Sequence, residues 1–190
     1  MNYKAVIIGG SAGSFQMVTK ILSNLPSNFK IPVVLALHRL KHVRHGFVEA
    51  LSIKSVLPVA EPLDKENLRS GKVYLAPANY HLYIELAGKF ALSTEEPVNH
   101  SRPAIDLTFM TGGYCYKEKT IGIILSGANK DGAWGLKKVK DWGGLTIVQD
   151  PKEAQMPTMP VAAIEKTGKV DHVFKIDQII QFLIDLNKNQ

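Results

Sequence analysis

The chain has 190 residues, of which 45% are hydrophobic and 21% are charged, so it can bury a substantial core. Its single cysteine excludes an internal disulfide framework and a cysteine metal cluster. No apolar run approaches the roughly 20 residues of a membrane span, and the N-terminus lacks the layout of a signal peptide. We therefore expect a cytoplasmic protein without membrane insertion. The net charge of +6 favours an acidic partner or substrate.

Apolar runs of strand length alternate with helical patterns along the chain. The predicted strands cover residues 5–8, 31–37, 72–77, 121–126 and 144–150. Their continuous apolarity indicates burial on both faces. Helical spacing of apolar residues predicts helices within 15–25, 133–139 (ending at Gly143 and Gly144) and 179–184. Residues 81–93 predict an antiparallel hairpin around residues 87–89. We therefore predict a single α/β domain over residues 1–190, with a doubly wound, mainly parallel sheet and an antiparallel hairpin.

The stretch AVIIGGSAGS, residues 5–14, places a predicted strand directly before a turn of small residues. A dinucleotide-binding turn needs a glycine where Ser11 stands and an acidic residue about 20 positions later, where His38 and Arg39 are found instead. Residues 9–13 match G-x-S-x-G, a turn that exposes a serine nucleophile between a strand and a helix. The N–H of Ala12 can then face the developing oxyanion. The structural alternative is that Ser11 only caps the following helix.

Polar side chains follow several of the predicted strands, at the edge where open parallel sheets bind their ligands. Ser11 follows the first strand, His38 follows the second, and Asp131 follows the strand at 121–126 after a short turn. If these strands are neighbours, the three residues converge as the nucleophile, base and orienting acid of a serine hydrolase. Asp150, at the end of the strand at 144–150, is the rival for the acid.

The remaining histidines are weaker candidates. His42 and His45 belong to a basic stretch typical of solvated surface, and His81 and His172 are interpreted as structural or surface residues. His100 lies in a predicted loop and is the one with a candidate role near the site. No histidine pair has a convincing metal-ligand spacing with a carboxylate, and aromatic residues do not interleave with basic ones. We therefore expect no metal and no nucleic-acid partner.

The chain resembles the catalytic domain of the chemotaxis protein-glutamate methylesterases, the CheB family. The resemblance rests on an ordered series of blocks: VIIGGSAGS, LALH, VYLAPANYHL, PVNHSRPAIDLTF, GIILSGANKDGAWGL, GGLTIVQDPKEAQMPTMPVAAI and GKVDHVFKIDQI. It implies a triad of Ser11, His38 and Asp131, with Ala12 and the loop around Ala128 at the oxyanion. It also implies hydrolysis of γ-methyl esters of glutamate on methyl-accepting chemotaxis receptors, deamidation of receptor glutamines in many members, and no cofactor.

The sequence departs from the family pattern at three positions near the site. Ser14 stands where a glycine is usual, and Ala128 and Asn129 stand where a methionine and a glycine are usual. No receiver domain precedes Met1, so we expect activity without phosphorylation of this chain. Control then falls to the receptor or to a separate phosphorylated receiver protein, with residues 39–45 and 95–102 as predicted docking surfaces. The alternative function is a methylesterase-like adaptor without turnover, against which the intact triad argues.

Overall fold

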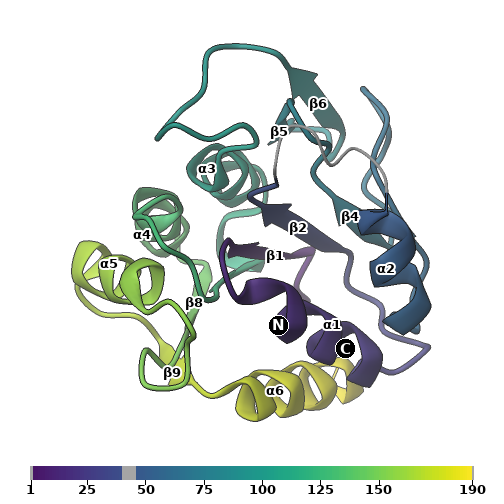
Figure 1. Ribbon diagram of the computed structural model, residues 1–190. Coiled ribbons are helices and arrows are strands. Elements are labelled where there is room, and N and C mark those ends of the chain that lie inside the picture. Colours follow the sequence, from purple (N-terminus) through teal and green to yellow (C-terminus); the bar gives the residue numbers. More distant parts are fainter. Residues whose placement is uncertain (1, 40–45, 190) are drawn as a thin grey trace.

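A parallel β-sheet forms the centre of the computed structural model, which describes residues 2–39 and 46–189 (Figure 1). Within these residues, seven strands run in the order β3-β4-β2-β1-β7-β8-β9, and every neighbouring pair is parallel. The strands are β1 (Ala5–Gly10), β2 (Val33–Leu37), β3 (Val59–Ala60), β4 (Val73–Leu75), β7 (Thr120–Ile124), β8 (Leu145–Gln149) and β9 (His172–Phe174). The central strands β1 and β2 are buried throughout, as their continuous apolarity predicts.

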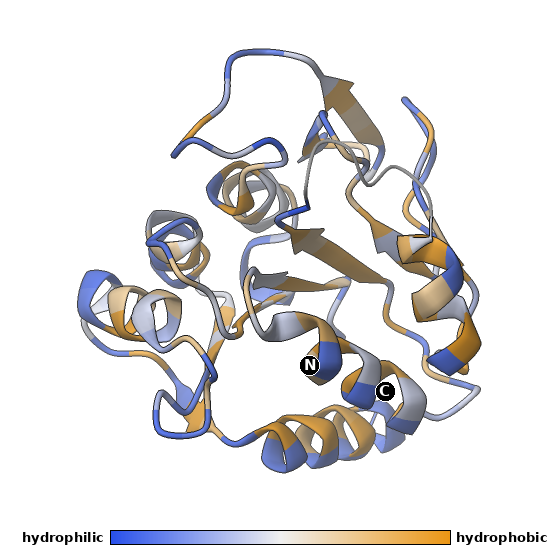
Figure 2. Ribbon diagram, viewed as in Figure 1, coloured by the Kyte–Doolittle hydropathy of each residue, from blue (hydrophilic) through white to orange (hydrophobic). Residues whose placement is uncertain are grey.

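Helices cover both faces of this sheet. They are α1 (Ser14–Asn24), α2 (Phe47–Lys54), α3 (Ile105–Tyr116), α4 (Ala133–Asp141), α5 (Thr158–Thr167) and α6 (Ile176–Lys188), with a short 3-10 turn at Lys117–Lys119. Val6 and Ile8 of β1 join one core with α1, α2 and α6, whereas Ala5 and Ile7 join another with α3, α4 and α5. Figure 2 shows hydrophobic central strands between helices whose hydrophilic residues face outward. Within the described residues, no helix combines the length and apolarity needed to cross a membrane.

The predicted fold class is confirmed. The five predicted strands correspond to β1, β2, β4, β7 and β8, and the predicted hairpin forms a separate two-stranded antiparallel sheet of β5 (His81–Ile84) and β6 (Phe90–Ser93). The three predicted helices are α1, α4 and α6. The sequence analysis missed α3, because its segment IDLTFMTGGYCY contains two glycines and buries the polar Asp106 and Thr108, which obscures an apolar stripe.

Helix α3 packs closely against β1 at Gly9. A Cβ added to Gly9 would lie 2.5 Å from Cγ2 of Ile105 and 2.8 Å from Cε2 of Phe109, so a side chain at this position would push the helix away. Glycine lets the backbone of β1 approach the first turn of α3. The N-terminus of α3 therefore lies at the carboxyl end of the sheet, where the candidate site is found.

Candidate active site

Ser11 and His38 follow two strands that are directly hydrogen-bonded to each other. Gly10 of β1 pairs with Leu37 of β2, and the backbone N–H of His38 donates to the Gly10 carbonyl at 3.1 Å. On the other side of β1, Gly9 pairs with Ile124 of β7, the strand that leads to Asp131. The predicted convergence of three strand ends at one edge is therefore present in the fold.

The turn after β1 is held by backbone bonds. The N–H of Ser11 donates to the Ser126 carbonyl at 2.9 Å, and the Ser11 carbonyl accepts both the N–H and the hydroxyl of Ser14, at 3.0 and 2.7 Å. Gly13, with φ of 79°, is the N-cap of α1, and no side chain caps this helix. Ser11 is therefore not the helix cap that the structural alternative required, and its hydroxyl remains available for chemistry.

His38 is oriented by Asp131. Its Nε2 lies 2.7 Å from Oδ2 of Asp131, with 13% of the histidine side chain exposed and none of the aspartate side chain. Because an ionised carboxylate only accepts hydrogen bonds, Nε2 carries the proton and Nδ1 keeps its lone pair. In the described part of the chain no hydrogen bond joins the Ser11 hydroxyl to the His38 ring. With its lone pair, Nδ1 is the nitrogen that can accept a proton. The missing hydrogen bond to Ser11 does not exclude this role, because such contacts often tighten only when substrate binds.

Asp131 is buried against the first turn of α3. Its Oδ2 accepts the N–H of Ile105 at 2.7 Å, and its Oδ1 accepts the N–H of Asp106 at 3.1 Å and the Asn99 amide at 3.0 Å. Burial raises the pKa of the Asp131 carboxyl, but hydrogen bonds from His38, the Ile105 N–H and Asn99 outweigh it and leave the pKa lowered. The acid therefore stays ionised, as a group that stabilises an imidazolium must.

This geometry is accompanied by a match to a known family. The model of the protein family described as "CheB methylesterase" matches residues 6–183 of the chain. The chain belongs to the CheB methylesterase family. The crystal structure of the Thermotoga maritima CheB methylesterase catalytic domain resembles the fold with a TM-score of 0.91 at 36% identity, covering 98% of this chain and 100% of that domain. The resemblance found in the sequence is therefore confirmed.

Relatives of two different lengths match this CheB-family chain. A Leptospira interrogans protein assigned as a protein-glutamate methylesterase/protein-glutamine glutaminase is 44% identical over 189 residues, which are 100% of this chain and 97% of that protein. A Thermotoga maritima protein of the same name is 37% identical over 190 residues, but only 54% of its length is covered. The chain therefore spans nearly the whole of one relative and about half of another.

Two backbone N–H groups lie at the predicted oxyanion positions. Ala12 and Ala128 are both exposed, and within the described residues neither donates its backbone N–H to another group. Ala12 directly follows Ser11, and Ala128 lies in the loop between β7 and Asp131. Backbone N–H groups that are not used within the fold can donate to a developing oxyanion.

The departures from the CheB pattern are accommodated in the site. Ser14 closes the turn around Ser11 by donating its N–H and its hydroxyl to the Ser11 carbonyl. A Cβ added to Gly10 would lie 2.6 Å from Cβ of Ser14, so this serine requires glycine at position 10. Asn129 accepts the N–H of Asp131 at 3.1 Å, and its Nδ2 lies 3.4 Å from Nδ1 of His38. Asn129 therefore links the acid to the base.

The rival residues have other contacts. Asp150 accepts the N–H of Lys152 at 2.9 Å, beyond β8. His81 is fully buried, where Nδ1 accepts the N–H of Ala104 at 3.2 Å and Nε2 lies 3.0 Å from the Glu96 carbonyl, so it is structural as predicted.

Neither His172 nor His100 is hydrogen-bonded to His38 or Asp131 in the described part of the chain. His172 stacks on Phe174, with ring centroids 4.5 Å apart. His100 is exposed in a turn next to Asn99. His42 and His45 lie outside the described residues. Among residues 2–39 and 46–189, no group of three or more His, Cys, Asp or Glu side chains is arranged to hold a metal ion.

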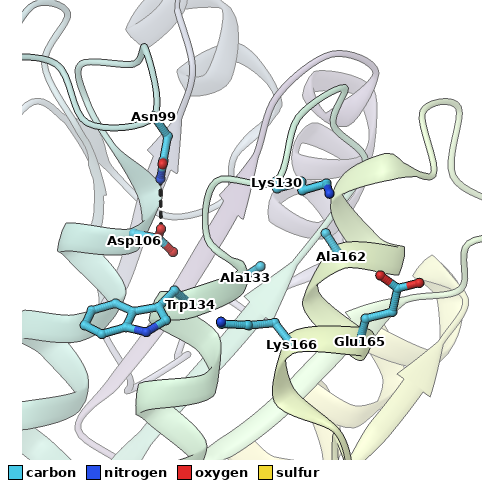
Figure 3. Close-up of a pocket in the computed structure, with 8 residues that line it drawn as sticks. All are labelled: Asn99, Asp106, Lys130, Ala133, Trp134, Ala162, Glu165 and Lys166. Carbon is cyan, nitrogen blue, oxygen red and sulfur yellow. Dashed lines mark hydrogen bonds between the residues drawn. The ribbon is translucent and has the colours of Figure 1, made fainter.

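Sequence analysis missed two residues that contact Asp131. Asn99 and Asp106 both lie in the quoted block PVNHSRPAIDLTF, but no local pattern assigned them a role. They line a cavity of about 440 Å³ between α3, α4 and α5. Figure 3 shows the Asn99 amide bonded to Asp106 at one wall, with Lys166 of α5 reaching toward Trp134 of α4. The cavity therefore lies directly behind the acid of the candidate triad.

Proposed function

We propose that this CheB-family enzyme hydrolyses γ-methyl esters of glutamate residues in chemoreceptors, with Ser11 as nucleophile, His38 as general base and Asp131 as orienting acid. The observation that carries the proposal is the 2.7 Å bond between Nε2 of His38 and Oδ2 of Asp131, placed where Ser11 ends the neighbouring strand. Family membership supports ester hydrolysis, the names of the relatives support glutamate side chains of proteins as the substrate, and the resemblance to the chemotaxis methylesterases points to chemoreceptors.

Acylation begins when Oγ of Ser11 attacks the ester carbonyl carbon. The serine proton passes to Nδ1 of His38, because the Nε2 proton is already shared with Asp131. Asp131 then stabilises the imidazolium, and its lowered pKa keeps it ionised. The negative charge on the carbonyl oxygen is stabilised by the N–H groups of Ala12 and Ala128, and one such donor is worth about 10²–10³-fold in rate.

Collapse of the tetrahedral intermediate breaks the bond between the carbonyl carbon and the methoxy oxygen. His38 gives its proton to that oxygen, so methanol leaves and an acyl-Ser11 ester remains. A water molecule then attacks the acyl carbon and gives its proton to His38. The second collapse returns that proton to Oγ of Ser11, which restores the enzyme and frees the glutamate carboxyl group.

Glutamine deamidation follows the same route with a different leaving group. When the acyl carbon carries an amide, His38 protonates the nitrogen and ammonia leaves in place of methanol. The acyl-Ser11 intermediate and its hydrolysis are unchanged. The names of the Leptospira and Thermotoga relatives include both activities, which supports extending the second one to this chain.

The partner of this reaction is a receptor helix that presents acidic and esterified glutamates. The chain carries a net charge of +6, which favours encounter with an acidic substrate, although the cavity beside the site combines Lys130 and Lys166 with Asp106 and Glu165. We place this reaction in the cytoplasm, in keeping with a chain that holds one cysteine. A separate phosphorylated receiver protein is the proposed source of control.

The test is methanol release from a methylated receptor by the purified chain. Ser11→Ala should abolish release and keep the parental melting temperature, because the Ser11 contacts in the turn are made by its backbone. Asp150→Asn, on a neighbouring strand end, is the matched control and should retain most of the activity. Release by a folded Ser11→Ala protein at the parental rate would refute the assignment. A parental chain that binds the receptor but releases no methanol would favour the adaptor.

A further inference from the structure

The side-chain amide of Asn99 is bonded to two carboxylates at once. Its Nδ2 donates to Oδ2 of Asp106 at 2.9 Å and to Oδ1 of Asp131 at 3.0 Å. A primary amide has two hydrogens on this nitrogen, so both are used. Figure 3 shows the bond to Asp106 at the wall of the cavity. Asn99 therefore joins the acid of the triad to a second buried acid.

The two carboxylates stabilise the starts of each other's helices. Asp131, which precedes α4, accepts the N–H groups of Ile105 and Asp106 in the first turn of α3. Asp106, in that first turn of α3, accepts the N–H of Gly135 in α4 at 2.7 Å. Each acid thus satisfies N–H groups that a helix N-terminus leaves unpaired. The exchange locks α3 to α4 around Asp131.

Close placement of two buried acids is unfavourable without a donor between them. Asp106 is 8% exposed and Asp131 is 1% exposed. Burial raises the pKa of the Asp106 carboxyl, and the neighbouring charge of Asp131 adds to this effect. The Asn99 amide points the positive ends of its two N–H bonds at the two carboxyl groups. An amide does not titrate, so this donor is present at every pH. It therefore reduces the repulsion between the two carboxyl groups.

A tight turn directs Asn99 into this position. Val98 and Ser101 exchange two backbone hydrogen bonds, of 3.2 and 2.9 Å, across the turn. Asn99 and His100 between them have φ of 52° and 61°, a left-handed conformation that asparagine tolerates better than most residues. Arg102 anchors the same loop by donating to the Thr94 carbonyl at 2.7 Å. The backbone thus presents the amide to the acids.

We propose that Asn99 is a positioning residue for the triad: it holds Oδ1 of Asp131 so that Oδ2 faces Nε2 of His38. Three donors hold Oδ1, and Asn99 is the one that comes from a side chain, on a loop separate from the two helices. Without it, the carboxylate can rotate and is repelled by Asp106, which weakens the bond that orients His38. This inference rests on the proposed function, because it assigns Asp131 the role of orienting acid.

Asn99→Asp and Asn99→Gly test the proposal from two sides. The first keeps the shape but replaces the donor with a third carboxylate, and the second removes the amide while suiting the left-handed backbone. Lys65→Gly changes a residue with the same left-handed backbone conformation, φ of 64°, outside residues 39–45 and 95–102, and is the matched control. Both Asn99 variants should react with a fluorophosphonate at Ser11 at least about tenfold more slowly than the parent, measured well below their melting temperatures.

Methanol release and the fluorophosphonate rate together distinguish a positioning role of Asn99 from a purely structural one. They also test the proposed function separately. For methanol release, kcat should fall by the same factor as the fluorophosphonate rate, while KM stays nearly constant, because Asn99 acts through Asp131 and not on substrate. Asn99→Asp should be slower than Asn99→Gly, and Lys65→Gly should match the parent. Parental fluorophosphonate rates in both Asn99 variants would overturn the proposal, while methanol release by the parent would leave the proposed function standing. A parent that neither labels at Ser11 nor releases methanol would overturn both.

Discussion

Replacing Asp131 with asparagine should remove nearly all activity, because no orientation of an amide fits the donors around this side chain. Oδ2 accepts hydrogen bonds from His38 and from the Ile105 N–H. Oδ1 accepts them from Asn99 and from the N–H groups of Asp106 and Gly132. An amide nitrogen therefore faces two donors in one orientation and three in the other. The first orientation is less costly, and it places N–H groups opposite His38.

The expected losses of kcat and of stability in Asp131→Asn follow from these contacts. Opposite an amide N–H, the His38 ring must carry its proton on Nδ1, where it can no longer accept the proton of Ser11. Loss of the correct tautomer in this way costs on the order of 10⁴-fold in kcat in serine proteases. With its proton on Nδ1, His38 accepts the amide N–H at Nε2, so the Ile105 N–H is the donor left without an acceptor and about 1–3 kcal/mol of stability should be lost. For a chain of this size, the melting temperature should fall by about 2–12 °C.

The assay compares Asp131→Asn with Asp150→Asn. Methanol release gives kcat/KM, and urea unfolding gives the free energy of unfolding for both variants. Asp150 accepts a hydrogen bond from the Lys152 N–H, which the oxygen of an amide can also accept, so this control should stay close to the parent. If Asp131→Asn keeps kcat/KM within tenfold of the parent, or if Asp150→Asn is equally damaging, the assignment of the acid is wrong.

Two further predictions concern the surroundings of Asp131. Because folding lowers the pKa of its carboxyl, the stability that this group contributes is present above the ordinary aspartate value of about 3.9 and is lost as the pH falls through the lowered native value. The free energy of unfolding in urea should therefore fall more between pH 6 and pH 3 in the parent than in Asp131→Asn, and equal falls would contradict this. Gly9→Ala places a Cβ 2.5 Å from Cγ2 of Ile105, so α3 must move from β1 together with the N–H groups that hold Asp131. We expect a loss of about 1–3 kcal/mol and a lower kcat, and an alanine variant with parental stability and kcat would show that this close packing is dispensable.

Much of the sheet and its reactive edge can be predicted from local sequence. The apolar runs at 5–8 and 31–37 predict strands buried on both faces, and β1 and β2 are buried throughout. Strand ends in a parallel sheet meet at one edge, so Ser11 and His38 can be placed together without coordinates. The G-x-S-x-G turn adds a candidate nucleophile, and Asp131 is a candidate because it follows a predicted strand. The strands and the meeting of their ends are confirmed, because apolar runs of strand length are local patterns.

The tertiary structure alone decided how Asp131 is held and which nitrogen of His38 faces it. Ile105 and Asn99 contact Asp131 from 26 and 32 positions earlier in the chain, and neither has a local signal for this role. The segment of α3 is obscured as a helix by its glycines and buried polar residues, yet its approach to Gly9 delivers the N–H groups around Asp131. A sequence pattern records which faces of an element are apolar. The distances between side chains on separate elements depend on how those elements pack. That packing depends on contacts between residues throughout the chain, which no local pattern contains.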